Sequence, residues 1–159
     1  MLLSWLPKAA YGLVHEVTRH ILKRPVVSIA AVVRTRDGGF VLVRRADTGT
    51  WCLPGGTLEW GETLTRGLAR ELEEEAGITE HRFVRMLGAW SDPARDPRFH
   101  AVTIAVECEA SPPSKAPMNP LEIREVKVFA EADLPERLAF GMEDIVAVAR
   151  RGPREGVLE

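Results

Sequence analysis

The sequence has little of several features that mark specialised classes of protein. Only 2 of its 159 residues are cysteine, and 6% are aromatic. Two cysteines, Cys52 and Cys108, exclude the dense disulfide framework of small secreted domains, and they lack the spacing of a metal site. Both lie in segments typical of buried strands, where a thiol packs as a small apolar side chain. We therefore expect a protein of the reducing cytoplasm.

An excess of one charge sign and long apolar runs are also missing. The formal net charge is -2 and the isoelectric point is near 6.1, which excludes the overall basic field that stable nucleic-acid or membrane binding usually needs. Lys8, Glu16 and Arg19 interrupt the apolar N-terminus. No stretch is then long enough to span a bilayer, and we expect no signal peptide. Any nucleotide partner should be a small molecule that is held locally.

The composition that remains is typical of one globular domain with a core, since 45% of the residues are hydrophobic and 28% are charged. We divide the chain into an N-terminal amphipathic helix (1–24), a main domain (25–152) and a frayed C-terminal tail (153–159). The apolar stripe of the helix can pack on its own domain, on a second copy in a homodimer, or on a membrane, in that order of preference. Its members recur at spacings of three or four: Leu3, Leu6, Ala10, Leu13, Val17 and Ile21.

The pattern of apolar runs and turn residues predicts a mixed sheet packed between helices. Residues 54–56, Pro-Gly-Gly, disfavour a continued strand or helix, and the proline-rich stretch from 111 to 120 is expected to be a surface loop. We predict strands over 26–33, 40–44, 51–53, 82–91, 99–109 and 123–129, and helices over 62–76 and 142–150.

The helix predicted over 62–76 carries an unusual cluster of glutamates. At about 100° per residue, Leu64, Leu68 and Leu72 form its core-facing stripe. Glu71 borders this stripe and Glu75 enters it, while Glu74 lies about 60° to the other side of Glu71 and Glu73 points away. Unpaired carboxylates are costly beside a core, and the negative end of the helix dipole makes them costlier.

Something positive should therefore compensate Glu71, Glu74 and Glu75. Arg70 can serve Glu74 at i,i+4, but one guanidinium cannot neutralise three carboxylates together with a phosphate substrate. Oxygen ligands without histidine or thiolate favour a hard divalent cation, Mg²⁺ or Mn²⁺. Gly55 and Gly56 precede the helix and let the backbone approach a ligand closely, so a main-chain carbonyl there can add an oxygen ligand. Glu62, in the first helical turn, suits the helix dipole and has a structural role at least as readily as a chemical one.

These residues match a known motif. The segment from Gly56 to Ile78 resembles a complete Nudix box. In it, five residues separate Gly56 from Glu62, and seven more separate Glu62 from the run that begins at Arg70. No position departs from it, and such fixed identities at fixed spacing make a chance match improbable. The resemblance implies an α/β/α sandwich and hydrolysis of a nucleoside diphosphate linked to another group, giving a nucleoside monophosphate and a sugar phosphate when that group is a sugar.

The resemblance also assigns roles by position. It implies that Glu71, Glu74 and Glu75 bind the metals, that the Gly55 carbonyl contributes, and that Glu62 supports the loop and helix, with Gly56 and Arg70 beside it. Family members often take a general base from a loop far beyond the box, which points to Glu122 and, second, to Glu125.

The substrate is indicated by the loop that follows the box. Pro93 lies 15 residues after Ile78, where ADP-ribose-cleaving members of the family tend to have proline, and the run 91–100 resembles that subgroup. We therefore expect ADP-ribose or another nucleoside diphosphate sugar. Arg95 and Arg98 of this loop are candidate phosphate ligands. Arg44 and Arg45 are further candidates for binding phosphate. Because successive side chains of a strand point to opposite faces of the sheet, only one of these two arginines is expected to face the site.

Three alternatives stay open on the sequence alone. Trp60 can stack on a base or cover the helix. The enzyme can instead act on nucleoside triphosphates or on triphosphorylated RNA ends. A non-catalytic Nudix module that senses a nucleotide is the alternative from another class, although such a module is expected to lose a metal-binding glutamate and none is missing here.

Overall fold

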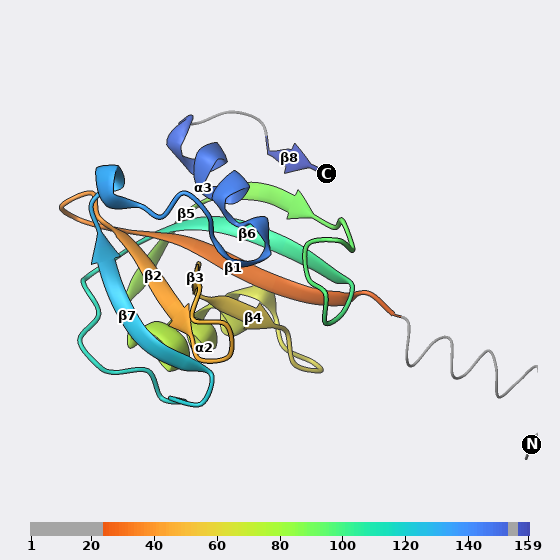
Figure 1. Cartoon of the computed structure of the whole chain (residues 1–159), viewed down its shortest axis with the longest axis horizontal. Coiled ribbons are helices and arrows are strands. Elements are labelled where there is room, and N and C mark those ends of the chain that lie inside the picture. Colours follow the sequence, from red (N-terminus) through yellow and green to blue (C-terminus); the bar gives the residue numbers. More distant parts are fainter. Residues whose placement is uncertain (1–23, 153–155) are drawn as a thin grey trace, which may run out of the picture.

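The structure, a computed structural model, describes residues 24–152 and 156–159, and these form one eight-stranded mixed sheet with helices on both faces (Figure 1). The helix expected within residues 1–24 lies outside the described residues. The strands are β1 (Val26–Thr35), β2 (Phe40–Arg45), β3 (Trp51–Cys52), β4 (Gly55–Thr57), β5 (His81–Trp90), β6 (Ala101–Ala110), β7 (Ile123–Phe129) and β8 (Val157–Leu158). The helices are α2 (Leu64–Ala76) and α3 (Glu143–Arg150), with short 3-10 turns η1 (Glu131–Asp133) and η2 (Ala139–Gly141).

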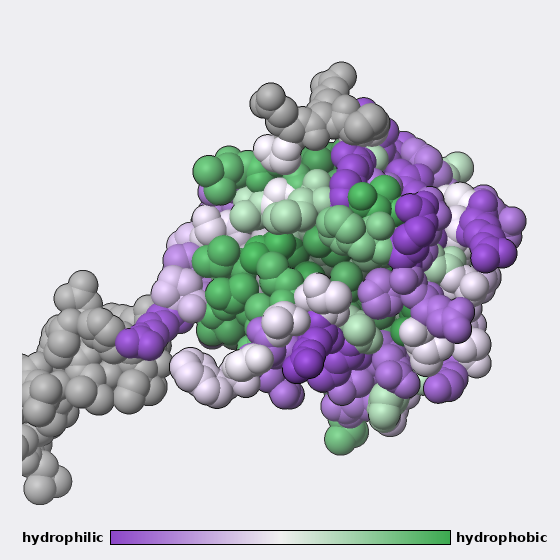
Figure 2. All heavy atoms as spheres, turned by 180° about the vertical axis from the view of Figure 1, so that it is seen from behind, coloured by the Kyte–Doolittle hydropathy of each residue, from purple (hydrophilic) through white to green (hydrophobic). Residues whose placement is uncertain are grey.

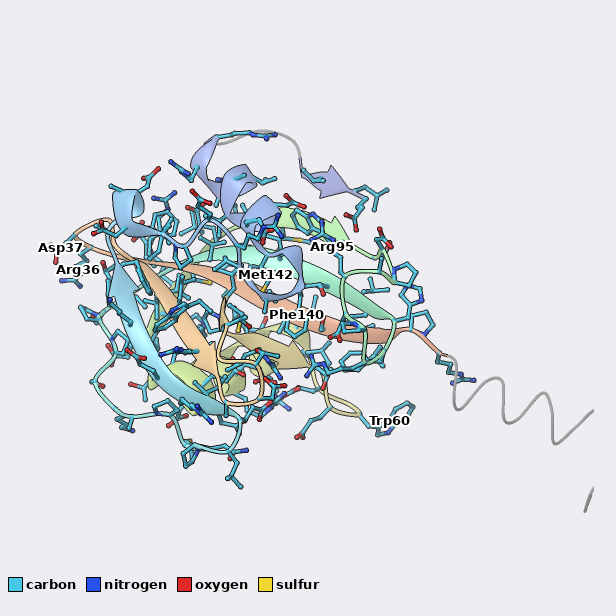
Figure 3. The ribbon with its side chains drawn as sticks, viewed as in Figure 1. Arg36, Asp37, Trp60, Arg95, Phe140 and Met142 are labelled. Carbon is cyan, nitrogen blue, oxygen red and sulfur yellow. The ribbon has the colours of Figure 1, made fainter. Side chains whose placement is uncertain are left out.

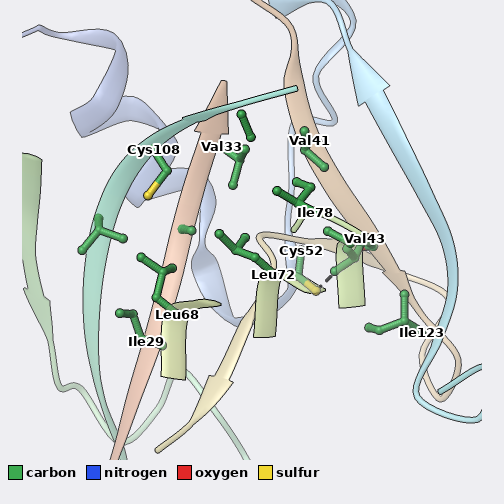
Figure 4. Close-up of a cluster of buried hydrophobic side chains, with 14 residues drawn as sticks. Ile29, Val33, Val41, Val43, Cys52, Leu68, Leu72, Ile78, Cys108 and Ile123 are labelled. Carbon is green, nitrogen blue, oxygen red and sulfur yellow. Dashed lines mark hydrogen bonds between the residues drawn. The ribbon is translucent and has the colours of Figure 1, made fainter. Parts of the chain in front are cut away.

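Strand β1 runs through the centre of the sheet and is buried on both faces. It pairs in parallel with β6 and antiparallel with β2 and β4. Ile29, Ala31 and Val33 pack into the core cluster under α2, drawn in Figure 4, whereas Ala30 and Val32 pack into the second cluster, under α3. A continuous β-branched run forms this strand because both of its faces need apolar side chains. The expected α/β/α sandwich is confirmed.

Helix α2 begins two residues later than the sequence suggested. Thr63 caps it, and its hydroxyl accepts a hydrogen bond from the Arg66 amide at 3.3 Å. At the other end Gly77 adopts the left-handed conformation (φ 63°) that closes many helices. Glu62 therefore precedes the cap and does not lie in the first turn, which corrects its expected placement. Leu64, expected in the core stripe, is 36% exposed because it begins the helix at the edge of the core.

Two short strands contradict sequence expectations. Residues 55–57 form β4 although the Pro-Gly-Gly run disfavours a strand, since Gly55 lacks the Cβ that would collide with the Ile29 carbonyl of β1. The expected frayed tail contains β8, which pairs in parallel with Gly88 and Ala89 of β5. A Cβ at Gly88 would strike the Val157 backbone. In both places a glycine permits a close approach that only the tertiary structure reveals.

Both cysteines are free and buried, as expected. Burial raises the pKa of Cys52 to about 12 and that of Cys108 to about 11, so both remain thiols at neutral pH.

The surface of the domain has both hydrophobic and hydrophilic regions. On the face shown in Figure 2, hydrophobic residues gather next to hydrophilic ones. The exposed apolar side chains of the domain include Val27, Phe83 and Met86. Among the described residues, no helix is both long enough and apolar enough to cross a membrane.

Candidate active site

A cavity of about 360 Å³ opens between α2 with β4 on one side and the loops 91–99 and 139–142 on the other. Most of the residues singled out from the sequence line it, although they come from distant parts of the chain. The exceptions include Arg44 and Glu125, which pair with each other at 3.5 Å. The expected residues in the lining are Arg45, Gly55, Gly56, Arg70, Glu71, Glu74, Glu75, Arg95, Arg98 and Glu122.

The glutamates of α2 form what we call the acidic wall, consisting of Glu71, Glu74 and Glu75. Glu71 is 8% exposed and Glu75 is 7% exposed, whereas the Glu74 side chain is partly in solvent. Burial, with smaller contributions from the charges of Glu71 and Glu122, raises the pKa of Glu75 to about 8 in spite of the opposing hydrogen bond from the Gly55 amide. Burial also raises the pKa of Glu71. Two carboxylates thus lie where their charged forms are poorly compensated.

Arg70 holds the acidic wall to the loop that leads into α2. Its Nε and Nη2 each donate to the Glu62 carboxylate at 3.0 Å, and Nη2 also donates to the Thr57 carbonyl at 3.1 Å. Its Nη1 donates to Glu71 at 2.8 Å and to Glu74 at 3.4 Å. The bonds from Arg70, followed by one from the Glu59 amide, lower the pKa of Glu62 to about 2. These contacts agree with the supporting roles expected of Glu62 and Arg70.

Two glycines make room for these side chains. A Cβ at Gly56 would overlap the Glu71 carboxylate, and one at Gly67 would overlap Leu58 and approach the Glu62 carboxylate. The glycines of β4 therefore leave room for strand β1 and for the Glu71 carboxylate. The expected close approach of their backbone to a ligand stays a prediction. Gly67 was not singled out from the sequence, but a glycine inside a helix costs about 1 kcal/mol relative to alanine. The presence of a glycine inside the predicted helix was therefore a signal from which Gly67 could have been found.

A second group of lining residues, which we call the basic wall, consists of Arg45 and Arg98. Arg45 donates to both oxygens of Asp47 at 2.9 and 2.6 Å, and Arg98 to both oxygens of Asp96 at 2.9 and 2.8 Å. The bonds from Arg45 lower the pKa of Asp47. Burial alone would raise the pKa of Asp96, but its bonds to Arg98 outweigh burial and lower it. The basic wall is thus electrostatically compensated by the chain itself.

An aromatic side chain joins the two arginines. The guanidinium carbon of Arg45 lies 5.2 Å from the centroid of the Phe140 ring, and that of Arg98 lies 4.7 Å from it. Such distances are within cation–π range. Sequence analysis missed Phe140, Asp47 and Asp96, because their sequence context contains no motif. Phe140 and Asp96 line the cavity, whereas Asp47 contacts it through Arg45.

Three expected residues take other places. Arg44 donates to the Gly49 carbonyl at 2.9 Å and pairs with Glu125, so the second strand presents Arg45 and not Arg44 to the cavity. Trp60 is fully exposed and points away from the domain in Figure 3, so the alternative in which it covers the helix is wrong. Arg95 lies at the cavity, but its guanidinium bonds Glu159, Asp144 and backbone carbonyls.

The donor set of the acidic wall suits a hard cation. Within the described ranges, no three histidine, cysteine or acidic side chains lie close enough together to form a ready-made metal cage. The fit rests instead on Glu71 and Glu75, two buried carboxylates with raised pKa, and on the exclusively oxygen character of the ligands available. Glu71, Glu74 and Glu75, with Gly55 in contact with Glu75, are the residues that would hold Mg²⁺ or Mn²⁺.

Known proteins resemble the chain in sequence and fold. The family model described as the NUDIX domain matches residues 24–149. A MutT-like protein of Streptomyces ambofaciens is 58% identical over 52 residues, 33% of this chain and 34% of that protein, so the match spans about a third of the relative's length. An ADP-ribose pyrophosphatase of Methanocaldococcus jannaschii is 30% identical over 125 residues, 77% of this chain and 71% of that protein. The solved NUDIX domain of Shewanella oneidensis NrtR, complexed with ADP ribose, has the same fold: its TM-score is 0.69 at 24% identity, over 92% of this chain and 98% of that one.

Proposed function

The chain belongs to the Nudix family and is a pyrophosphohydrolase, and we propose that it hydrolyses the diphosphate of a nucleoside diphosphate sugar such as ADP-ribose. The products are a nucleoside monophosphate and a sugar phosphate. The similarity to the pyrophosphatase of Methanocaldococcus jannaschii supports this substrate class, as does the loop around Pro93.

The observation that carries the proposal is that one cavity has the acidic wall and the basic wall among its lining residues. A diphosphate has anionic oxygens that need cations on both sides. Arg45 and Arg98 supply fixed positive charge on one side, with planar guanidinium groups suited to phosphate oxygens. Glu71, Glu74 and Glu75 supply ligands for a cation on the other.

Each group then has a distinct task. Mg²⁺ held at the acidic wall would neutralise charge on the phosphate oxygens and lower the pKa of the attacking water. Arg45 and Arg98 orient the diphosphate, and Asp47 and Asp96 hold these two arginines in place. The ion pair of Arg70 with Glu62 keeps the loop that carries β4 against α2. Gly55 belongs to β4 and Glu75 belongs to α2. The ion pair between Arg70 and Glu62 therefore also fixes these two proposed metal ligands relative to each other.

Glu122 is our candidate for the general base. Two observations support it: Glu122 lines the cavity, and its charge raises the pKa of both Glu71 and Glu75. Glu125, the second candidate, is engaged by Arg44. A base must lie within reach of the water that it deprotonates, so the geometry favours Glu122.

A substrate panel with Mg²⁺, run in oxygen-18 water and analysed for phosphate-bearing products, tests the proposal. ADP-ribose should give AMP and ribose 5-phosphate, and the position of the label identifies the phosphorus that is attacked. Protein with Glu75→Gln, prepared in parallel, controls for contaminating hydrolases. Pyrophosphate released from nucleoside triphosphates or triphosphorylated RNA, with no cleavage of ADP-ribose, would overturn the choice of substrate. Absence of turnover across the panel would favour a nucleotide sensor. The expected cytoplasmic location and the homodimer alternative stay predictions.

A further inference from the structure

Arg95 has no hydrogen-bond donor left for a phosphate. Its Nη1 donates to the carbonyls of Phe140 at 3.3 Å and Gly141 at 2.8 Å. Its Nη2 donates to Asp144 at 2.9 Å and to Glu159 at 2.7 Å. Its Nε donates to the Glu159 carboxylate at 3.0 Å. A guanidinium has five N–H groups, and each one here has an acceptor within the protein. The expected role of Arg95 as a phosphate ligand would require breaking one of these bonds.

Glu159 is itself held firmly at the edge of the sheet. Its amide donates to the Ala89 carbonyl at 3.1 Å, which continues the pairing of β8 with β5. Its carboxylate accepts from the amides of Ser91 and Asp92, each at 3.0 Å. The bonds from Arg95, followed by that from the Asp92 amide, lower the pKa of Glu159 to about 2. Glu159 is therefore charged at any working pH and joins β8 to the start of the loop 91–98.

Phe140 is the residue that this network holds in place. It is the one non-glycine residue with positive φ in the described chain (φ 61°, ψ 22°). For an L-amino acid this conformation costs roughly 1–2 kcal/mol, so surrounding contacts must maintain it. Arg95 supplies them by donating to the carbonyls of two successive residues, Phe140 and Gly141. The labelled Arg95, Phe140 and Met142 lie close together in Figure 3, and all three line the cavity.

We propose that Arg95 and Glu159 are a positioning pair that fixes Phe140 and, through its ring, the two arginines of the basic wall. The line of contact runs from β8 to Arg95, from Arg95 to the strained Phe140 backbone, and from the Phe140 ring to Arg45 and Arg98. The proposal rests on the proposed function, in which the basic wall binds the diphosphate. None of the contacts of Arg95 involves α2, β4 or Glu122, so the pair acts on substrate binding and not on the acidic wall.

The kinetic test is Glu159→Gln, which keeps the size of the side chain but removes its charge. We expect KM for the substrate to rise about threefold, equivalent to about 0.7 kcal/mol and less than the effect of removing an arginine of the basic wall itself, while kcat stays within about 1.5-fold. Glu131→Gln is the matched control, since Glu131 also pairs with an arginine, Arg150, but away from the cavity. Its KM should be that of the unmodified protein. An unchanged KM in Glu159→Gln, or equal changes in both variants, would refute the proposal.

A second measurement follows the Phe140 ring without relying on turnover. With 4-fluorophenylalanine incorporated at position 140, the fluorine resonance should be single and sharp in the otherwise unmodified protein. It should shift or broaden in Glu159→Gln and in Arg95→Lys, which lacks the planar fork, but not in Glu131→Gln. If the protein hydrolyses none of the panel, the proposed function fails while this experiment still decides the positioning. A resonance unaffected by both variants would overturn it.

Discussion

The two walls of the cavity differ in how their charges are balanced. In the basic wall each guanidinium meets both oxygens of an aspartate, and these bonds lower the pKa of Asp47 and of Asp96. In the acidic wall the two buried carboxylates, Glu71 and Glu75, accept few hydrogen bonds from the protein, and burial raises the pKa of each. The chain completes the first wall by itself. On the proposed function a cation would complete the second wall, and this asymmetry predicts that activity depends on metal.

The largest expected effect comes from breaking the acidic wall. Glu75→Gln should lower turnover by at least about a thousandfold, or roughly 4 kcal/mol of barrier. Circular dichroism should show an intact fold, because a neutral amide is less costly to bury than a carboxylate. Glu73→Gln, on the exposed side of the same helix, should stay within about twofold of the unmodified enzyme. Equal losses in the two variants would contradict the assignment of helix faces.

The next effect concerns the base. Glu122→Gln should lower kcat by about a hundredfold, the usual contribution of a general base, with little change in KM. Glu125→Gln should leave kcat within about twofold, since Glu125 is engaged by Arg44 outside the cavity. Steady-state kinetics at saturating Mg²⁺ measure both. The reverse ranking would make Glu125 the base.

The pH dependence of metal binding sharpens the comparison further. Because the folded pKa of Glu75 is raised to about 8 from its ordinary 4.5, the metal-free native state holds more protons than the unfolded state between these values. Its stability should therefore fall as pH rises through this window. Mg²⁺ binds the deprotonated form, so its affinity should rise by up to about tenfold per pH unit below pH 8. Thermal melting with and without Mg²⁺ at pH 6, 7 and 8 should show a growing stabilisation by the metal. A stabilisation independent of pH would place the metal elsewhere.

The smallest effect is expected at the basic wall, which is already compensated. Arg98→Gln should raise KM about fivefold, corresponding to roughly 1 kcal/mol for a charge-assisted bond shared with Asp96. Arg44→Gln is the control and should leave KM unchanged, because Arg44 faces away from the cavity. Initial-rate measurements over a range of substrate concentrations separate the two. An effect of Arg44 as large as that of Arg98 would remove the distinction between the neighbouring arginines of β2.

Much of the fold could be read from local patterns. The β-branched run at 26–33 predicted the buried β1, and the spacing of Leu68 and Leu72 predicted the buried face of α2. The short strands β4 and β8 could not be read, because they owe their existence to distant strands that glycines allow to come close. Trp60 could not be placed either, since exposure depends on what the rest of the chain covers.

The amino-acid sequence by itself determined the acidic wall. Helical periodicity fixes where Glu71, Glu74 and Glu75 point, and no distant contact is needed to bring them together. The tertiary structure decided the rest of the site: which of Arg44 and Arg45 faces the cavity, that the Phe140 ring lies beside Arg45 and Arg98, and that Arg95 binds Glu159 at a separation of 64 residues. Such contacts depend on strand register and loop closure, which arise only from the packing of the whole chain.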